Sequence, residues 1–217
     1  MTLSAPASHL NINSMILYLK LPASLLVLLA MLGLAACDPV SLTIGAGAAT
    51  GIGAYQERGL EGVAHDTAIE AKVFKLWAQA DKSMVVHMSI EVYQSRVLLT
   101  GVARSEKERA SAVGMAWKVD GVEDVMNEII VGAPPDLAEI ARDTAITAEL
   151  KSKLTFDGDV QAVNYAIETV RGTVFLLGIA QDQAELDHVM TRARNISYVK
   201  RVVSYVQLKA AIKGGGS

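Results

Sequence analysis

The chain has 217 residues, a formal net charge of -3 and an isoelectric point of about 5.8. This slightly acidic balance gives no overall electrostatic footprint for nucleic acid. The single cysteine excludes an intramolecular disulfide. The mean hydropathy of +0.31 reflects one apolar segment near the N-terminus, so it does not indicate a bundle of membrane helices.

Residues 25–36 form an apolar run that ends in small residues and is too short for a comfortable transmembrane helix. Together with Lys20 just before it, this run predicts a signal peptide over residues 1–36. Residues 1–14 carry no positive charge, so Met15 is the better candidate for the true start. We therefore expect this part of the chain to be a targeting signal.

The signal segment ends in Leu34-Ala35-Ala36-Cys37, which resembles the bacterial lipobox. The resemblance implies that Cys37 becomes the first residue after cleavage and carries a diacylglycerol group and an N-acyl chain. Two or more acyl chains give stable anchoring, whereas one gives only marginal binding. The alternative is a buried cysteine that ends an apolar segment. Asp38 leaves the choice of membrane open, because Asp at this position commonly favours inner-membrane retention in enterobacteria.

Three segments look like connections and not like parts of a core. Residues 37–63 are rich in glycine and alanine and predict a spacer beside the membrane. A phosphate loop there is disfavoured, because no strand precedes the glycines and no Lys-Ser/Thr follows them. Residues 132–140 contain two prolines and predict a semi-rigid linker, and residues 209–217, which end in Gly-Gly-Gly-Ser, predict a flexible tail.

Between these segments the chain carries the same pattern twice, at a constant offset of 77 residues. Asp66-Thr67-Ala68-Ile69 returns as Asp143-Thr144-Ala145-Ile146, and the apolar run over residues 97–103 returns over residues 174–180. No gap is needed in this register. The chain therefore contains two small domains of one fold, over residues 64–131 and 141–208.

Each repeat is predicted to begin with a helix. Asp66 or Thr67 can cap it in the first copy, with Glu70 closing a capping box after Thr67, and Asp143 repeats Asp66 in the second copy. Alternating apolar residues from Val86 to Val92 then predict a half-buried strand. Gln94-Ser95, matched by Arg171-Gly172, predicts a tight turn before the returning strand.

A capping box, Ser105-x-x-Glu108, predicts the start of the second helix, and Asp182-x-x-Glu185 repeats it. The residues that suit the buried face of this helix are Ala110, Val113 and Trp117. A last strand follows over residues 122–131. The order α-β-β-α-β predicts an α+β fold, in which two helices cover one face of a three-stranded mixed sheet.

This pattern resembles the BON domain, a bacterial module. The resemblance lies in the hairpin Val97-Leu98-Leu99-Thr100-Gly101, the alanine-rich second helix and the closing segment over residues 119–127. In the second copy Tyr198 and Ser204 replace the Gly and Asn of the closing motif. Two such copies behind a lipobox resemble the dual BON-domain lipoproteins of Gram-negative envelopes.

The resemblance implies association with membranes, especially with anionic phospholipid, and maintenance of the envelope barrier without enzyme activity. It also implies a periplasm-facing location, with the outer membrane favoured. Gly101 and Gly178 are expected to matter for the fold, because a strand end there needs a residue without a side chain.

The residues themselves give little sign of catalysis or metal binding. The three histidines of the mature chain do not fall at short ligand spacings, and no second cysteine can join them: His65, His87 and His188. Glu91 and Glu168 are the strand carboxylates present in both copies. They are expected to be solvated residues on the sheet face, in different domains and without a partner group. We therefore predict no metal site and no catalytic residue.

The second repeat has eight acidic and eight basic residues, whereas the first has ten acidic and eight basic. The second is therefore the better candidate for an anionic membrane, near which each Lys or Arg contributes roughly 1 kcal/mol. Its candidate membrane-binding residues gather at the ends of its two helices: Lys151, Lys153, Leu154 and Phe156, and Arg192, Arg194, Lys200 and Arg201. The alternative is a mixed surface with Leu154 and Phe156 in the core.

In the first repeat, Phe74 and Trp77 cannot easily both face the core, so one of them is expected to contact lipid or a protein partner. The leading hypothesis is a lipid-anchored module that binds anionic phospholipid through its second repeat and supports envelope integrity. The alternative is a protein adaptor for an envelope assembly complex. Salt dependence separates the two, because electrostatic lipid binding fades with ionic strength.

Overall fold

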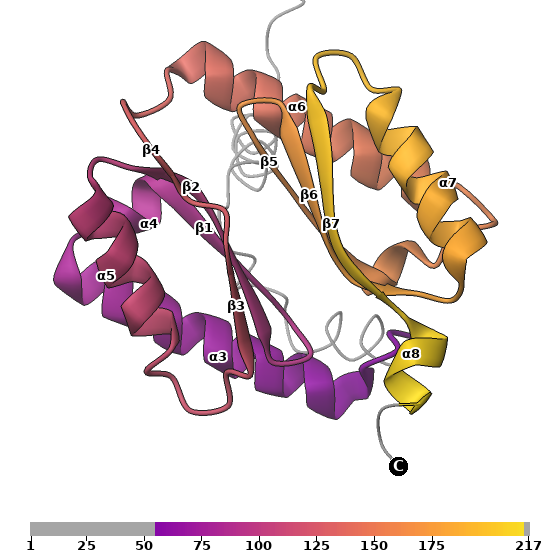
Figure 1. The fold of residues 1–217 in the computed structure, drawn as a ribbon. Helices are drawn as coiled ribbons and strands as arrows, with labels where there is room; N and C mark the ends of the chain where they lie inside the picture. Colours follow the sequence, from indigo (N-terminus) through magenta and orange to yellow (C-terminus); the bar gives the residue numbers. More distant parts are fainter. Residues whose placement is uncertain (1–54, 215–217) are drawn as a thin grey trace, which may run out of the picture. The chain divides into compact units, whose positions relative to one another are not determined.

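The computed structural model describes residues 55–214 (Figure 1). The predicted signal peptide, Cys37 and the spacer up to residue 54 lie outside the described residues. Helix α3 (Gly59–Ala80) begins inside the predicted spacer, α6 (Leu137–Thr155) inside the predicted linker, and α8 (Lys209–Gly214) inside the predicted tail. No helix within residues 55–214 has the length and apolar character that crossing a membrane requires.

The first repeat has the predicted order with one added helix. After α3 come α4 (Met84–His87), the antiparallel strands β1 (Met88–Tyr93) and β2 (Arg96–Ala103), and helix α5 (Glu106–Ala116). The last strand is interrupted, and its pieces β3 (Asp124–Asn127) and β4 (Ile130–Val131) both pair parallel with β2. The predicted first strand was too long at its start, because Val86 and His87 belong to α4.

The second repeat has the same architecture. It contains α6, the 3-10 helix η3 (Ala162–Asn164), the strands β5 (Tyr165–Val170) and β6 (Thr173–Ala180), helix α7 (Gln183–Arg194) and strand β7 (Arg201–Leu208). Its sheet has the order β5-β6-β7, with β5 antiparallel and β7 parallel to β6. The predicted α+β fold with a mixed sheet in each repeat is confirmed.

The strand register explains why a glycine recurs in both hairpins. Gly101 lies opposite Met88, and Gly178 lies opposite Tyr165. A Cβ atom would come within 2.3 Å of the His87 carbonyl oxygen at Gly101, and within 1.9 Å of the Asn164 carbonyl oxygen at Gly178. Both residues also have positive φ angles. These glycines are therefore required by the backbone, as predicted.

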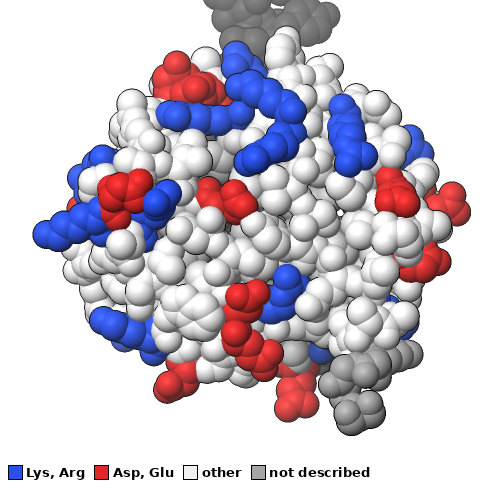
Figure 2. All heavy atoms as spheres, in the orientation of Figure 1, with Lys and Arg blue, Asp and Glu red and all other residues white. Residues whose placement is uncertain are grey.

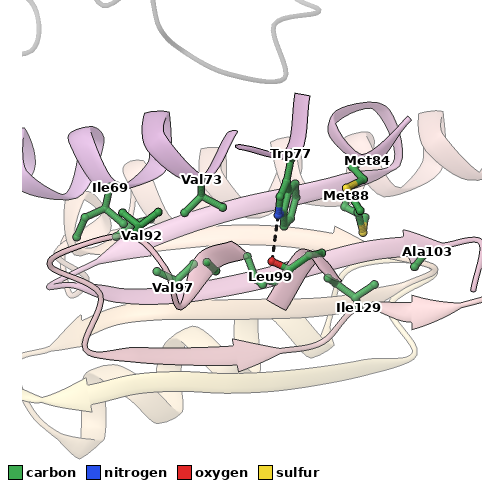
Figure 3. Close-up of a cluster of buried hydrophobic side chains, with 13 residues drawn as sticks. Ile69, Val73, Trp77, Met84, Met88, Val92, Val97, Leu99, Ala103 and Ile129 are labelled. Carbon is green, nitrogen blue, oxygen red and sulfur yellow. Dashed lines mark hydrogen bonds between the residues drawn. The ribbon is translucent and has the colours of Figure 1, made fainter. Parts of the chain in front are cut away.

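The core of the first repeat lies between its helices and one face of its sheet (Figure 3). Trp77 is fully buried there, and its indole N–H donates to the Ala112 carbonyl oxygen at 3.1 Å. The proposal of Trp77 as a partner-binding residue is therefore wrong, while Phe74 is half-buried. Trp117 is not on the buried face of α5, because it caps the helix and is 52% exposed, and Ala110 is also exposed.

The other face of each sheet is also buried, which the sequence pattern had not led us to expect. Side chains from both repeats form one apolar cluster between the sheets, to which β2 contributes Leu98 and β6 contributes three residues: Phe175, Leu177 and Ile179. In Figure 1 the two sheets face each other, with the helices on their outer sides. The two repeats are therefore packed against each other within one compact unit of the chain.

Residues just before α3 also join the repeats. The Glu57 N–H donates to the Asn164 side chain at 2.8 Å, and the Glu57 carboxylate pairs with Lys209 at 2.7 Å. The neighbouring Arg58 binds Asp66 at 2.6 Å and lies over the Tyr93 ring at 4.4 Å. The segment that leads into the first repeat thus contacts the end of the second.

Candidate lipid-binding surface

Two aspartates fix the hairpin turns against the first helix of each repeat. Asp143 on α6 accepts hydrogen bonds from the N–H groups of Arg171 (2.6 Å) and Gly172 (2.9 Å). Asp66 on α3 accepts the equivalent bonds from two residues of the first hairpin, Gln94 and Ser95, both at 2.8 Å. The interpretation as helix caps is wrong, since both helices begin more than a turn earlier. The turn of β5–β6 therefore lies beside the first half of α6.

Helix α6 has one face in the core and a face of small, uncharged side chains in solvent. Its start is set by a capping box. The Asp136 carboxylate accepts a hydrogen bond from the Glu139 N–H at 2.7 Å, and the Glu139 carboxylate accepts one from the Asp136 N–H at 3.1 Å. Side chains on the outer face are small and exposed: Ala138, Ala141, Thr144, Ala145, Ala148 and Ser152. Leu137, 84% exposed, and Phe156, 86% exposed, lie at its two ends.

The predicted cluster at the end of α6 divides between core and surface. Leu154 is fully buried among the core residues of the second repeat, so its assignment to a membrane surface is wrong. Phe156 lines a surface hollow together with residues of α6, of the turn that follows it and of α7: Ser152, Lys153, Asp157, Gly158 and Arg192. The structure thus brings Lys153 and Arg192, from separate sequence clusters, to the same exposed aromatic ring.

The charges around this hollow are mostly paired. Lys153 binds Glu149 at 2.7 Å, and Arg192 binds Asp157 at 2.9 Å. His188 contacts the same Asp157 carboxylate at 2.8 Å, and these contacts hold the pKa of Asp157 below its usual value. A membrane phosphate would therefore have to compete with Asp157 for Arg192.

The other predicted basic residues lie at the last turn of α7 and at the start of β7. Arg194, Lys200 and Arg201 are exposed, and none of them forms a salt bridge within residues 55–214. The Lys200 N–H donates to the Gly172 carbonyl oxygen at 2.8 Å, which places this segment at the hairpin turn. Basic side chains gather on the upper part of the face in Figure 2, where Figure 1 shows α6 and the turn between β5 and β6.

Lys151 is an exposed residue of α6. Its charge acts on the carboxyl groups of both Glu91 and Glu168. Burial, followed by the charge of Glu168, raises the pKa of Glu91 to about 8. Burial also raises the pKa of Glu168, which accepts a hydrogen bond from the Ser89 hydroxyl at 3.0 Å. The expectation that these glutamates are solvated and lie apart is therefore wrong.

Sequence reasoning missed several exposed residues beside the predicted ones. Leu137 lies in a stretch predicted as linker, so it was not considered as the apolar end of a helix. Tyr198 is 71% exposed, and the Arg142 guanidinium lies 5.4 Å from its ring centroid. The replacement of the motif glycine by Tyr198 was visible in the sequence and was the available signal. In the part of the chain that the structure describes, no three potential ligands cluster as a metal site would require.

The geometry defines a protein of two αββαβ repeats with an exposed, uncharged helix face and nearby basic residues. A family model for the BON domain matches residues 65–133 and 142–210, and the chain belongs to that family. A protein of Anaplasma centrale described as an uncharacterized protein in the gshII 5'region is 39% identical over 145 residues, which cover 66% of this chain and 95% of that protein.

Two further relatives carry functional names. The outer membrane lipoprotein DolP of Haemophilus influenzae is 37% identical over 112 residues, which cover 51% of this chain and 57% of DolP. The osmotically-inducible protein Y of Escherichia coli is 32% identical over 146 residues, which cover 66% of this chain and 73% of that protein.

Proposed function

We propose that this chain is a lipid-anchored, periplasm-facing protein that binds anionic phospholipid through its second repeat and supports the integrity of the cell envelope. The BON family membership and the relative named as an outer membrane lipoprotein support the envelope location. The lipobox-like segment that ends at Cys37 supports the anchor. The proposed function is binding, and it assigns a catalytic role to none of these residues.

The outer face of α6 is the observation that carries the proposal. Its small uncharged side chains form a surface that can lie flat in the headgroup layer, while Leu137 and Phe156 at its ends can insert. Full burial of each large apolar side chain contributes about 1.5–3 kcal/mol. Nearby basic residues add roughly 1 kcal/mol each at an anionic surface. Such a contact is modest alone, and the acyl anchor strengthens it by keeping the membrane close.

The proposal is tested by flotation of the acyl-free chain, residues 38–217, with lipid vesicles. We expect binding to vesicles that contain phosphatidylglycerol or cardiolipin, weak binding to phosphatidylcholine alone, and loss of binding at high salt. The double variant Leu137→Ser plus Phe156→Ser should lose most of this binding. Trp117→Ser is the matched control, because it also removes a large exposed apolar side chain but lies on the first repeat.

Each outcome of the flotation bears on the role of α6. Binding that needs anionic lipid, falls with salt and survives in the Trp117→Ser control supports the proposal. Absence of flotation under all conditions would contradict it. An equal loss in the control and in the double variant would show that α6 is not the contacting surface.

A protein adaptor is the second candidate, and exposed Trp117 favours it. A tryptophan that is 52% exposed is typical of protein contacts, and it lies on the repeat that does not carry the apolar α6 face. Photocrosslinking from position 117 in intact cells, with position 110 on the same helix as control, tests this candidate. A defined protein partner captured from 117 and not from 110 would support it.

A further inference from the structure

Tyr198 has a backbone conformation that its residue type disfavours. Its φ angle is +69°, and the equivalent residue of the first repeat, Gly121, has a φ angle of +98°. A residue with a Cβ atom is strained in this left-handed region, whereas glycine is not. The second repeat therefore has an aromatic residue at a position where the fold favours glycine.

The Tyr198 ring does not pack in the core of the protein. The side chain is 71% exposed, and its ring contact within the described residues is with the Arg142 guanidinium on the surface. A strained residue whose side chain adds nothing to the core is expected where the side chain has another role. The observation therefore points to a contact outside the protein.

The surroundings of Tyr198 show what kind of contact this is. Its carbonyl oxygen would lie 2.8 Å from a Cβ atom at Gly172, so the residue adjoins the turn that Asp143 fixes beside α6. Arg142 and Lys200 flank it, both are exposed, and neither forms a salt bridge within residues 55–214. An exposed aromatic ring between unpaired cations suits the headgroup layer of an anionic bilayer.

We infer that Tyr198 is an interfacial anchor, whose ring lies among the lipid headgroups while Arg142 and Lys200 face their phosphates. This inference rests on the proposed function and names a further residue of its surface. Tyr198 lies toward the amino-terminal half of α6, and Phe156 lies at its carboxyl end. Two aromatic contacts at separate points along the helix hold α6 parallel to the membrane plane.

The test uses the acyl-free chain, residues 38–217, and vesicles that contain phosphatidylglycerol. Tyr198→Asn removes the ring, while asparagine tolerates the left-handed backbone. We expect about a fivefold loss of vesicle binding, with a melting temperature that is unchanged or raised by about 2–4 °C. Tyr198→Trp should retain binding. The difference between its fluorescence emission and that of the wild type, which contains Trp77 and Trp117, should shift to shorter wavelength when anionic vesicles are added.

Unchanged vesicle binding by Tyr198→Asn, or an unshifted difference emission of Tyr198→Trp on bound protein, would overturn this inference. The emission measurement decides the question even if Tyr198→Asn folds poorly. Failure of the wild-type chain to bind vesicles would instead remove the proposed function itself. If Leu137→Ser plus Phe156→Ser abolishes binding while both Tyr198 variants behave as wild type, only the role of Tyr198 is wrong.

Discussion

Glu91 and Glu168 occupy equivalent positions of the two repeats, and the packing of the sheets brings their carboxyl groups within electrostatic reach of each other. Neither residue is exposed, and a hydrogen bond from Ser89 on one sheet reaches Glu168 on the other. Lys151 and Arg58 act on Glu91 in the opposite sense to Glu168 and Glu70. The contact between the repeats therefore contains a group that holds its proton in the folded state.

This arrangement predicts how stability depends on pH. Burial and the charge of Glu168 raise the pKa of Glu91 from 4.5 to about 8, so the folded chain binds this proton more tightly than the unfolded chain does. The resulting stabilisation is complete below about pH 4.5 and is lost as the pH rises through about 8.

The pH prediction is checked with Glu91→Gln in urea unfolding across pH 5–9. The free energy of unfolding of the wild type should fall over this range, and the variant should be flatter and more stable at pH 8 by roughly 1–3 kcal/mol. Exposed Glu123→Gln is the control and should follow the wild type. Identical pH profiles for wild type and Glu91→Gln would show that the carboxyl group is not buried on folding.

The two turn-binding aspartates should differ in their contribution to stability. Asp143→Ala leaves two backbone N–H groups without their acceptor and should cost about 1–3 kcal/mol. Asp66→Ala should cost more, because it also removes the carboxylate that pairs with Arg58, whose side chain is only 14% exposed. Chemical denaturation measures both, with exposed Asp120→Ala as the control. Equal costs would mean that the hydrogen bonds of Arg58 to Gln56 and to the Val92 carbonyl oxygen are sufficient without Asp66.

Substitution of the two tryptophans should change the free energy of unfolding by very different amounts. Trp77→Ala removes the largest side chain of the first core and should lower the free energy of unfolding by about 3–5 kcal/mol. Trp117→Ala changes an exposed side chain and should stay within about 0.5 kcal/mol. Thermal unfolding of the two variants checks this, and a large loss for Trp117→Ala would place it in a packed interface.

Cys37 should decide whether the protein partitions with membranes in cells. The wild type is expected to incorporate labelled palmitate and to enter the detergent phase of a phase separation. Cys37→Ser should do neither. If Cys37→Ser partitions with membranes as strongly as the wild type does, another part of the chain must anchor the protein.

Much of the fold was predictable because local patterns agree with the tertiary structure. The capping residues Ser105 and Asp182 and the paired turns at Gln94 and Arg171 mark elements that the structure confirms. The burial of both faces of each sheet was not predicted. The signal was present, since the run over residues 97–103 is almost continuously apolar, as is typical of strands covered on both sides.

The surface was harder to predict, because exposure depends on where an element begins and which way it faces. Leu154 and Phe156 are two positions apart at the end of α6, yet one is in the core and the other in solvent. Trp77 and Trp117 both fit a helical apolar pattern, but Trp117 caps its helix and turns outward. Whether such a side chain is buried or exposed depends on its tertiary neighbours and not on the periodicity of the sequence.

Fluorophore scanning along α6 tests the central claim most directly. The acyl-free chain contains no cysteine, so single cysteines at positions 137, 145 and 156 can carry an environment-sensitive dye, with position 110 on α5 as the control. On anionic vesicles we predict a shift of dye emission to shorter wavelength at all three α6 positions and none at 110. Emission that is unchanged along α6 while the protein is bound would contradict the assignment of this face to the membrane.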